Sequence, residues 1–192
     1  MKTDQRILEI AEEILSYEGL GALSFDAIAR RLGRSKQAVL YWFPTKPDLL
    51  AALFLPLLEA EADIAARAVG SATNRAGAIS SFVTAVAEFH LANLERFRLM
   101  YLAPQTTQHR GHSPEPSTLL QRIPPVTSRI YDALAPHLDK EETAARQQAV
   151  AVHAAVLGLV LMVSLSDAVN DPLRHGTDAL INALIASLTQ AP

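Results

Sequence analysis

Cysteine is missing from the 192 residues, which excludes disulfide bonds, thiolate metal sites and cysteine nucleophiles. Glycine is scarce, with 8 residues, and aromatic residues make up only 6% of the chain. Hydrophobic residues make up 49% and charged residues 19%. A chain of this length and composition can bury a sizeable core, which indicates a globular and mainly helical protein rather than a disordered one.

The amino terminus, MKTDQR followed by an amphipathic run, lacks the apolar core of a signal peptide. No apolar run in the sequence reaches the roughly 20 residues that a membrane span needs. The absence of cysteine also suits a reducing compartment. These absences predict a cytoplasmic protein without a membrane partner.

Residues 24–46 read as two short helices joined by a turn, with a third helix starting directly after them. Ser24 and Ser35 are good N-caps for helices at 25–32 and 36–43. Gly33 allows the chain to leave the first helix, and Pro44 ends the second. The sequence Thr45-Lys46-Pro47-Asp48 resembles a capping box with Asp in place of Glu. Two helices and a glycine turn at this spacing suggest a DNA-binding helix-turn-helix.

The same stretch is basic although the chain is acidic. It carries five basic side chains and one acidic one, a net charge of +4, whereas the whole chain carries −3. The basic residues are Arg30, Arg31, Arg34, Lys36 and Lys46, and the acidic residue is Asp26. This concentrates the attraction for phosphate where the motif lies, so the low overall charge does not argue against DNA binding. A solvated basic face is the alternative reading.

The string from Ser24 to Leu50 resembles the signature of the tetracycline-repressor (TetR) family of transcriptional regulators. The matching pieces are Phe25-Asp26-Ala27-Ile28-Ala29, Leu32-Gly33-Arg34-Ser35-Lys36-Gln37-Ala38, Leu40-Tyr41-Trp42-Phe43-Pro44-Thr45-Lys46 and Leu49-Leu50. The chain departs from the family at Trp42, where histidine or tyrosine is more frequent, and at Gln37-Ala38, where a glycine-containing pair is frequent. Beyond residue 50 the resemblance lies in length, helical content and the order of segments.

Near the start of the second helix, Lys36 and Gln37 are the expected base readers, because Lys reaches guanine acceptors and Gln pairs with adenine. By the resemblance, Ser24, Ser35, Tyr41, Thr45 and Lys46 contact phosphate. The predicted partner is double-stranded operator DNA. The full predicted set of DNA-binding residues is Ser24, Arg34, Ser35, Lys36, Gln37, Ala38, Tyr41, Trp42, Thr45 and Lys46.

The periodicity of apolar residues predicts an all-α fold with two domains. Residues 1–48 form a three-helix DNA-binding domain, whose first helix spans 4–17. A helix over 46–67, which contains Pro56 and should bend or end there, links this domain to a helical bundle at 49–192. Further helices are expected at 73–97, at 98–103, from 139 to about 167, and at 177–188. A helical turn or two is expected at 117–123, before a helix that starts at Pro124-Pro125 and ends at Leu134 or His137. A long polar loop is expected from Pro104 to Pro116.

The last two helices are broadly apolar, and residues 149–165 are apolar nearly all the way round, as in a helix buried on several sides. They carry more apolar surface than one partner layer can cover, which predicts a two-fold homodimer. The predicted interface residues are Val156, Val160, Leu180, Leu184, Ile185 and Leu188.

The family resemblance implies a small-molecule effector pocket between helices of the bundle. Candidate lining residues are aromatic or isolated polar groups on apolar faces: Phe82, Phe89, His90, Asn93, Tyr101, Tyr131, His153, Leu157 and Met162. Each of them alone is also compatible with ordinary core packing.

Catalytic chemistry has little support in the sequence. His109 and His112 offer two imidazoles without a third ligand, so no metal site is predicted. No G-x-S-x-G turn or glycine-rich phosphate loop is present, and no catalytic residue or cofactor is predicted. The predicted function is a ligand-released repressor that binds a near-palindromic operator as a dimer. The alternatives are a regulator without a small-molecule effector, controlled by a protein partner, and, more weakly, a helical ligand-binding enzyme.

Overall fold

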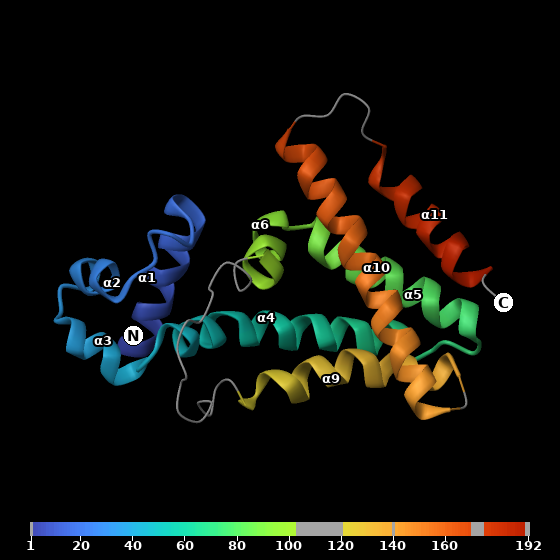
Figure 1. Ribbon diagram of the computed structural model, residues 1–192, viewed down its shortest axis with the longest axis horizontal. Coiled ribbons are helices and arrows are strands. Elements are labelled where there is room, and N and C mark those ends of the chain that lie inside the picture. The colour runs from blue at the N-terminus through green and yellow to red at the C-terminus, as the bar shows by residue number, and fades with distance from the viewer. Residues whose placement is uncertain (1, 103–120, 140, 170–174, 191–192) are drawn as a thin grey trace. The chain divides into compact units, whose positions relative to one another are not determined.

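The computed structural model describes residues 2–102, 121–139, 141–169 and 175–190, and within these ranges all regular structure is helical (Figure 1). In chain order the elements are α1 (Thr3–Glu18), α2 (Phe25–Leu32), α3 (Lys36–Trp42), α4 (Lys46–Val69), α5 (Arg75–Leu91), α6 (Leu94–Phe97), the π-helical turn η1 (Arg98–Leu102), α9 (Ile123–Leu134), the 3-10 turn η2 (Ala135–His137), α10 (Glu142–Ala168) and α11 (Thr177–Thr189). The predicted all-α fold is confirmed. The predicted loop from Pro104 to Pro116, with its two histidines, lies outside the described residues.

Backbone contacts divide the chain into two units, and each is described by itself. Unit 1 comprises Met1–Leu58 and Glu95–Pro125, and unit 2 comprises Glu59–Leu94 and Val126–Pro192. The division falls inside α4. The functional boundary predicted near residue 48 is a different division and stays a prediction.

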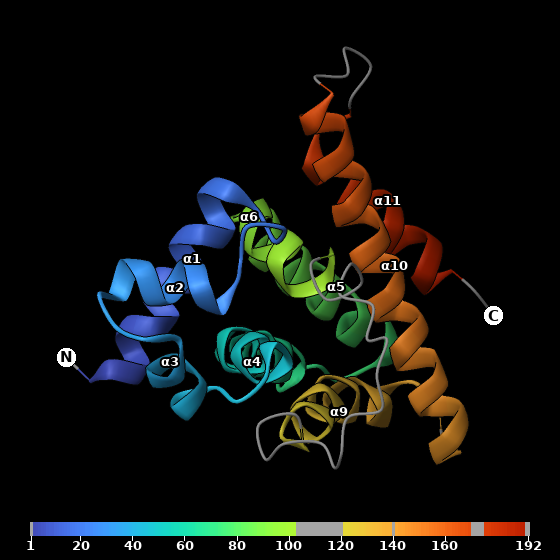
Figure 2. The same cartoon turned by 60° about the vertical axis from the view of Figure 1, so that its left-hand side comes forward.

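The core of unit 1 is the face of α1 that the sequence predicted. Ile7, Ile10 and Ile14 are fully buried and pack in one cluster with Ile28 of α2 and Val39 of α3. Figure 2 shows these three helices grouped together. Burying each isoleucine stabilises the fold by roughly 1.5–3 kcal/mol relative to leaving it exposed. This core therefore fixes the position of α3 against α1 and α2 within unit 1.

The segment after α5 differs from the prediction of one helix over 73–97. α5 ends at Leu91, and the Asn93 N–H bonds to the carbonyl of His90, three residues back, so the regular helical register stops there. A new short helix, α6, follows. Its continuation places Leu99 against the core cluster of unit 1. The break thus lies beside the passage of the chain from unit 2 to unit 1.

In unit 2, α5, α10 and α11 pack side by side, as both ribbon views show (Figures 1 and 2). α9 lies along the second half of α4, and Arg129 of α9 pairs there with Asp63. Arg146 of α10 pairs with Asp132 of α9 at 2.6 Å.

The sequence predicted that Pro56 bends or ends the helix that contains it. In the structure α4 continues through Pro56, so this proline does not end the helix.

α10 is not buried on several sides, as the sequence suggested. Its buried residues follow one stripe: Ala145, Ala149, Val152, His153, Val156, Val160 and Ser164. Opposite them, Met162 is 62% exposed and Leu165 is 51% exposed. Within one chain α10 therefore leaves much apolar surface uncovered.

The expectation that no segment is long and apolar enough to cross a membrane is wrong for this helix. Within Glu142–Ser166 the most apolar 18-residue window has a mean hydropathy of 2.2, and 33% of this window is buried. The prediction missed this because it counted uninterrupted apolar runs, which Ser and Gly break. A helix that packs against its own chain on one face and against a protein partner on the other also meets this criterion of length and mean hydropathy.

Candidate nucleic-acid interface and effector site

The turn between α2 and α3 is built by the caps that the sequence predicted. The Ser24 and Ser35 hydroxyl oxygens accept from the backbone N–H groups of Ala27 and Ala38 at 3.1 and 3.3 Å. Gly33 has a φ of 67°, a left-handed conformation that suits glycine. The N–H of Arg34 bonds to the carbonyl of Ala29, which completes a Schellman ending for α2. These local bonds fix where α3 starts.

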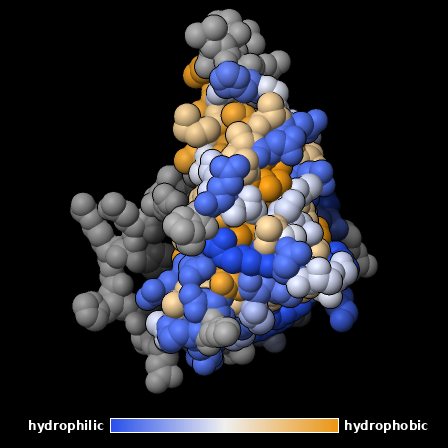
Figure 3. Space-filling view, turned by 90° about the vertical axis from the view of Figure 1, so that its right-hand side faces the viewer, coloured by the Kyte–Doolittle hydropathy of each residue, from blue (hydrophilic) through white to orange (hydrophobic). Residues whose placement is uncertain are grey.

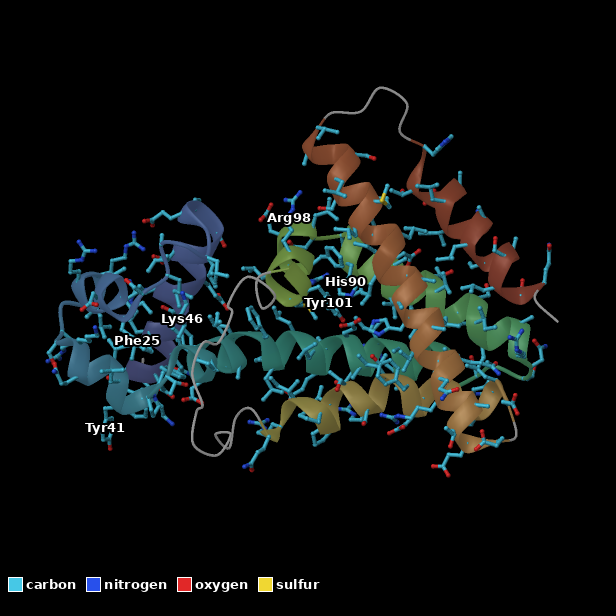
Figure 4. All side chains as sticks on the ribbon, in the orientation of Figure 1. Phe25, Tyr41, Lys46, His90, Arg98 and Tyr101 are labelled. Carbon is cyan, nitrogen blue, oxygen red and sulfur yellow. The ribbon has the colours of Figure 1, made fainter. Side chains whose placement is uncertain are left out.

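The outer face of α3 carries the predicted readers. Lys36 and Gln37, in its first turn, are exposed. Tyr41 is 79% exposed and Trp42 43% exposed, and their rings meet edge to face with centroids 5.5 Å apart. Figure 4 shows Tyr41 projecting away from the helix. Exposed basic, amide and aromatic side chains gathered on one helix face suit contact with a nucleic acid.

Several basic side chains of residues 24–46 already have protein partners. Lys36 Nζ donates to Asp26 Oδ2 at 2.8 Å, and Lys46 Nζ donates to the carbonyl of Leu23 at 2.8 Å. Arg31 pairs with Glu18. Arg34 is exposed and has no ion pair with any residue that the structure describes. Arg34 is therefore the most readily available cation of this face.

The start of α4 forms the predicted capping box. Asp48 Oδ2 accepts from the Thr45 N–H at 3.1 Å, and Thr45 Oγ1 accepts from the Asp48 N–H at 3.3 Å. The Thr45 hydroxyl also donates to Asp48 Oδ2 at 2.7 Å. This box fixes the entry into α4 directly after α3. Aspartate thus replaces the usual glutamate in this role.

Six of the candidate effector residues lie in one part of unit 2. Phe82, His90 and His153 are buried, and Tyr131 is half-buried with its ring centroid 5.7 Å from that of His153. Phe82 meets His153 edge to face at 6.0 Å, and Phe89 meets His90 at 5.0 Å. Leu157 is half-buried on α10 one turn after His153.

Three candidates lie elsewhere. Met162 is on the exposed face of α10, Asn93 is exposed, and Tyr101 belongs to unit 1, where it packs on Phe97 with ring centroids 5.6 Å apart. The assignment of Met162 to an interior pocket does not fit its exposure.

The chemistry of the interior centres on Glu61, which sequence reasoning missed. Its side chain is fully buried, and its Oε1 accepts from His153 Nε2 at 2.9 Å and from His90 Nε2 at 3.1 Å. Burial alone raises the pKa of the Glu61 carboxyl. The hydrogen bonds and charges of His153 and His90 outweigh it and lower this pKa to about 2. The carboxylate is therefore ionised inside the protein.

A signal for Glu61 does exist in the sequence. It lies on the stripe of α4 that contains Leu58, Ala62 and Ala65, all of which are buried. A carboxylate on an apolar stripe needs interior partners. The histidines on the apolar faces of 73–97 and 149–165 were identified, but the acid that joins them was not.

Tyr131 borders this cluster. Burial, and then the negative charge of Glu61, raise the pKa of its phenol, whereas the Arg146 guanidinium lowers it. Arg146 lies over the Tyr131 ring, 5.5 Å from its centroid. Among the described residues no group of three acidic or imidazole side chains is arranged to hold a metal ion. Within the cluster, His90 and His153 are hydrogen-bonded to Glu61.

The predicted interface residues divide in two groups. Val156 and Val160 are fully buried within their own chain, so their assignment to a surface between copies does not fit the structure. Leu180, Leu184, Ile185 and Leu188 are half-buried on α11. The exposed stripe of α10 instead contains Ala151, Ala154, Gly158, Met162 and Leu165. The apolar pattern predicted which helices are involved but not which face is free.

Residues 7–53 match the family model described as bacterial regulatory proteins, tetR family. No curated protein matches the chain. Solved structures share its fold at low identity. A TetR transcriptional regulator from Legionella pneumophila is 18% identical with a TM-score of 0.61, covering 99% of this chain and 97% of that one. PfmR, a TetR family regulator from Thermus thermophilus, is 19% identical with a TM-score of 0.63, covering 97% and 98%.

A third structure is the transcriptional regulator FadR from Bacillus subtilis in complex with stearoyl-CoA, 14% identical with a TM-score of 0.67, covering 97% of each chain. The matched region contains the helix-turn-helix described above, and the structural likeness extends over the whole chain. The chain therefore matches the tetR family of bacterial regulatory proteins over residues 7–53, and as a whole it shares the fold of solved TetR regulators.

Proposed function

We propose that the protein is a homodimeric repressor that binds a near-palindromic operator and leaves it when a small molecule binds in unit 2. The observation that carries this proposal is the exposed face of α3, which contains Lys36, Gln37, Tyr41 and Trp42. Both α2 and α3 begin at a serine that caps the helix, so the start of α3 is fixed. A helix-turn-helix presents such a face to the major groove. Action on DNA also places the protein in the cytoplasm.

The dimer is supported by the uncovered apolar face of α10. Figure 3 views the molecule from the side on which α11 lies in Figure 1. Apolar residues gather in the upper part of this view. Ala154, Gly158 and Met162 recur on α10 at intervals of four residues, and the small residues allow a second helix to approach closely. A two-fold pair places two recognition helices on half-sites roughly 34–36 Å apart, or a multiple of that distance.

The effector is supported by the polar groups inside unit 2, since a bundle interior with a few placed polar groups is the usual form of a ligand site. The Bacillus subtilis structure contains stearoyl-CoA, so this compound is a suitable first probe for the present chain. The coupling must be reciprocal: a compound that weakens operator binding is itself bound more weakly in the presence of operator, by the same factor.

The test is a footprint of the purified protein on the DNA upstream of its own gene. A protected near-palindrome supports both the class and the dimer. Lack of protection at micromolar protein and low salt contradicts the proposal. A compound that binds unit 2 while operator affinity stays unchanged contradicts the ligand-released mechanism and favours control by a protein partner.

A further inference from the structure

The buried residues at α3 determine which of its side chains point outward. Val39 is fully buried and Phe43 is 5% exposed, so the side of the helix that contains them faces the core of unit 1. Successive residues of an α-helix are rotated by about 100°, which places Gln37 and Tyr41 each about 200° from Val39. These two side chains therefore lie one turn apart at the centre of the exposed face. Trp42 lies about 60° from Val39 on the same count, at the flank of this face.

The exposure of the two aromatic side chains agrees with these positions. Tyr41 is 79% exposed and projects away from α3 (Figure 4), whereas Trp42 is 43% exposed. Their rings meet edge to face, with centroids 5.5 Å apart and planes at 89°. Such a pair is attractive beyond the area that it buries. The indole at the flank therefore limits the directions in which the phenol ring points.

The neighbours of Tyr41 favour DNA as the molecule that covers its ring. Arg34 and Lys36, close to the start of α3, are exposed cations that attract phosphate. In the major groove an apolar or aromatic side chain recognises thymine by contact with its 5-methyl group. An amide such as that of Gln37, one turn before Tyr41, recognises adenine in the same groove. A ring at the centre of this face thus suits the edge of a base better than the phosphates beside the groove.

Resting on the proposed function, we infer that Tyr41 is a specificity-determining residue whose ring contacts the 5-methyl group of one thymine in each half-site. This role differs from the phosphate contact that the family resemblance implied for Tyr41. The ring supplies the contact, so the hydroxyl group is dispensable. Each half-site accordingly requires a thymine, and not only an A·T pair, at the position that faces Tyr41.

The first experiment keeps the wild-type chain and changes only the DNA. Each thymine of the footprinted operator is replaced in turn, at symmetric positions of both half-sites, by uracil. Uracil forms the same base pair and lacks only the methyl group. We expect at least one position at which affinity falls about fourfold per half-site, which corresponds to the loss of one buried methyl group. An operator in which no thymine is sensitive to this change overturns the inference.

The second experiment assigns the sensitive thymine to Tyr41. Tyr41→Ala removes the ring, so we expect the uracil substitution at that position to have no further effect in this variant. Tyr41→Phe removes only the hydroxyl group, so we expect it to keep the wild-type affinity and the sensitivity to uracil. Tyr17→Ala, which truncates a tyrosine that is 87% exposed on α1, is the matched control and should behave as the wild type.

The thymine and uracil operators are compared within each variant, so a smaller fraction of folded protein does not change the result. Sensitivity to uracil that persists in Tyr41→Ala overturns the inference. So does an equal loss of affinity for operator and scrambled DNA in Tyr41→Phe, because this loss indicates a phosphate contact through the hydroxyl group. If the wild type does not discriminate the operator from scrambled DNA of equal length, the proposed function fails instead.

Discussion

Lys36 Nζ lies 2.8 Å from Asp26 Oδ2, so the first residue of α3 is bound by an acid of the preceding helix. Both side chains are largely exposed, and such a pair contributes only about 0–1 kcal/mol to stability. Under the proposed function its consequence for DNA binding is larger, because the Lys36 amine must leave the carboxylate before it reaches a base or a phosphate. In that proposal the Asp26 carboxylate competes with the nucleic acid for Lys36.

We expect Asp26→Asn to raise affinity for operator and random DNA severalfold, since the variant frees Lys36 and removes a negative charge near the phosphates. Fluorescence anisotropy at several salt concentrations measures this effect. Glu9→Gln, which removes the same charge from the exposed pair with Arg6 at 2.8 Å, serves as the control. Unchanged or weaker binding by Asp26→Asn shows that Lys36 does not contact DNA.

Gln37 and Arg34 separate base reading from phosphate contact. We expect Gln37→Ala to relax preference at one base pair by about 1–3 kcal/mol, because its amide is placed in the first turn of α3. Arg34→Ala should weaken all sequences alike and reduce the salt slope by about 1. Competition between operator variants measures both. An equal loss on operator and random DNA for Gln37→Ala removes it from the base readers.

Lys46 is a poorer probe of phosphate contact than the sequence suggested. Its amine donates to the carbonyl of Leu23, so a substitution there also disturbs the approach to α2. Only the three-dimensional fold brings these two residues together, because they are 23 positions apart in sequence.

Local signals account for what was predictable in unit 1. Ser24, Gly33, Ser35 and Thr45 act through bonds to neighbours within a few residues, so the bounds of α2 and α3 follow from the sequence. The Glu61 cluster depends on partners 29 and 92 residues away. Periodicity placed His90 and His153 on apolar faces, but it does not determine which faces meet.

The same limit explains the errors on α10. A helix that is apolar nearly all the way round gives no indication of which stripe its own chain covers. Val156 and Val160 were therefore assigned to the wrong side, while Met162 was placed inside. The packing of α5 and α11 against α10, which the sequence does not specify, decides the outcome.

Glu61 should make stability depend on pH in acid. Its carboxyl has a folded pKa of about 2 against an ordinary value of 4.5, so its contribution is fully present above pH 4.5 and is lost as the pH falls toward 2. The difference corresponds to about 3 kcal/mol. We expect urea unfolding to show the wild type more stable than Glu61→Gln at pH 6, with the gap closing between pH 4.5 and 2. A gap that is independent of pH contradicts the ionised state of Glu61.

The dimer interface is best tested on the exposed stripe of α10. Met162→Glu places a charge where the side chain is 62% exposed in one chain, so it should leave the protomer folded and break the pair, because burying an unpaired charge at an interface is costly. Charges at Leu184 or Ile185 are less informative, since both side chains are half-buried within the chain and their loss also damages the fold. Tyr17→Glu is the control, because Tyr17 is 87% exposed on α1, which belongs to unit 1, whereas the stripe of α10 belongs to unit 2.

Sedimentation equilibrium at micromolar concentrations should give a dimer for the wild type and for Tyr17→Glu, and a monomer for Met162→Glu. Operator affinity should fall together with the dimer, because each protomer alone reads one half-site. A wild-type monomer with full operator affinity contradicts the two-fold assignment.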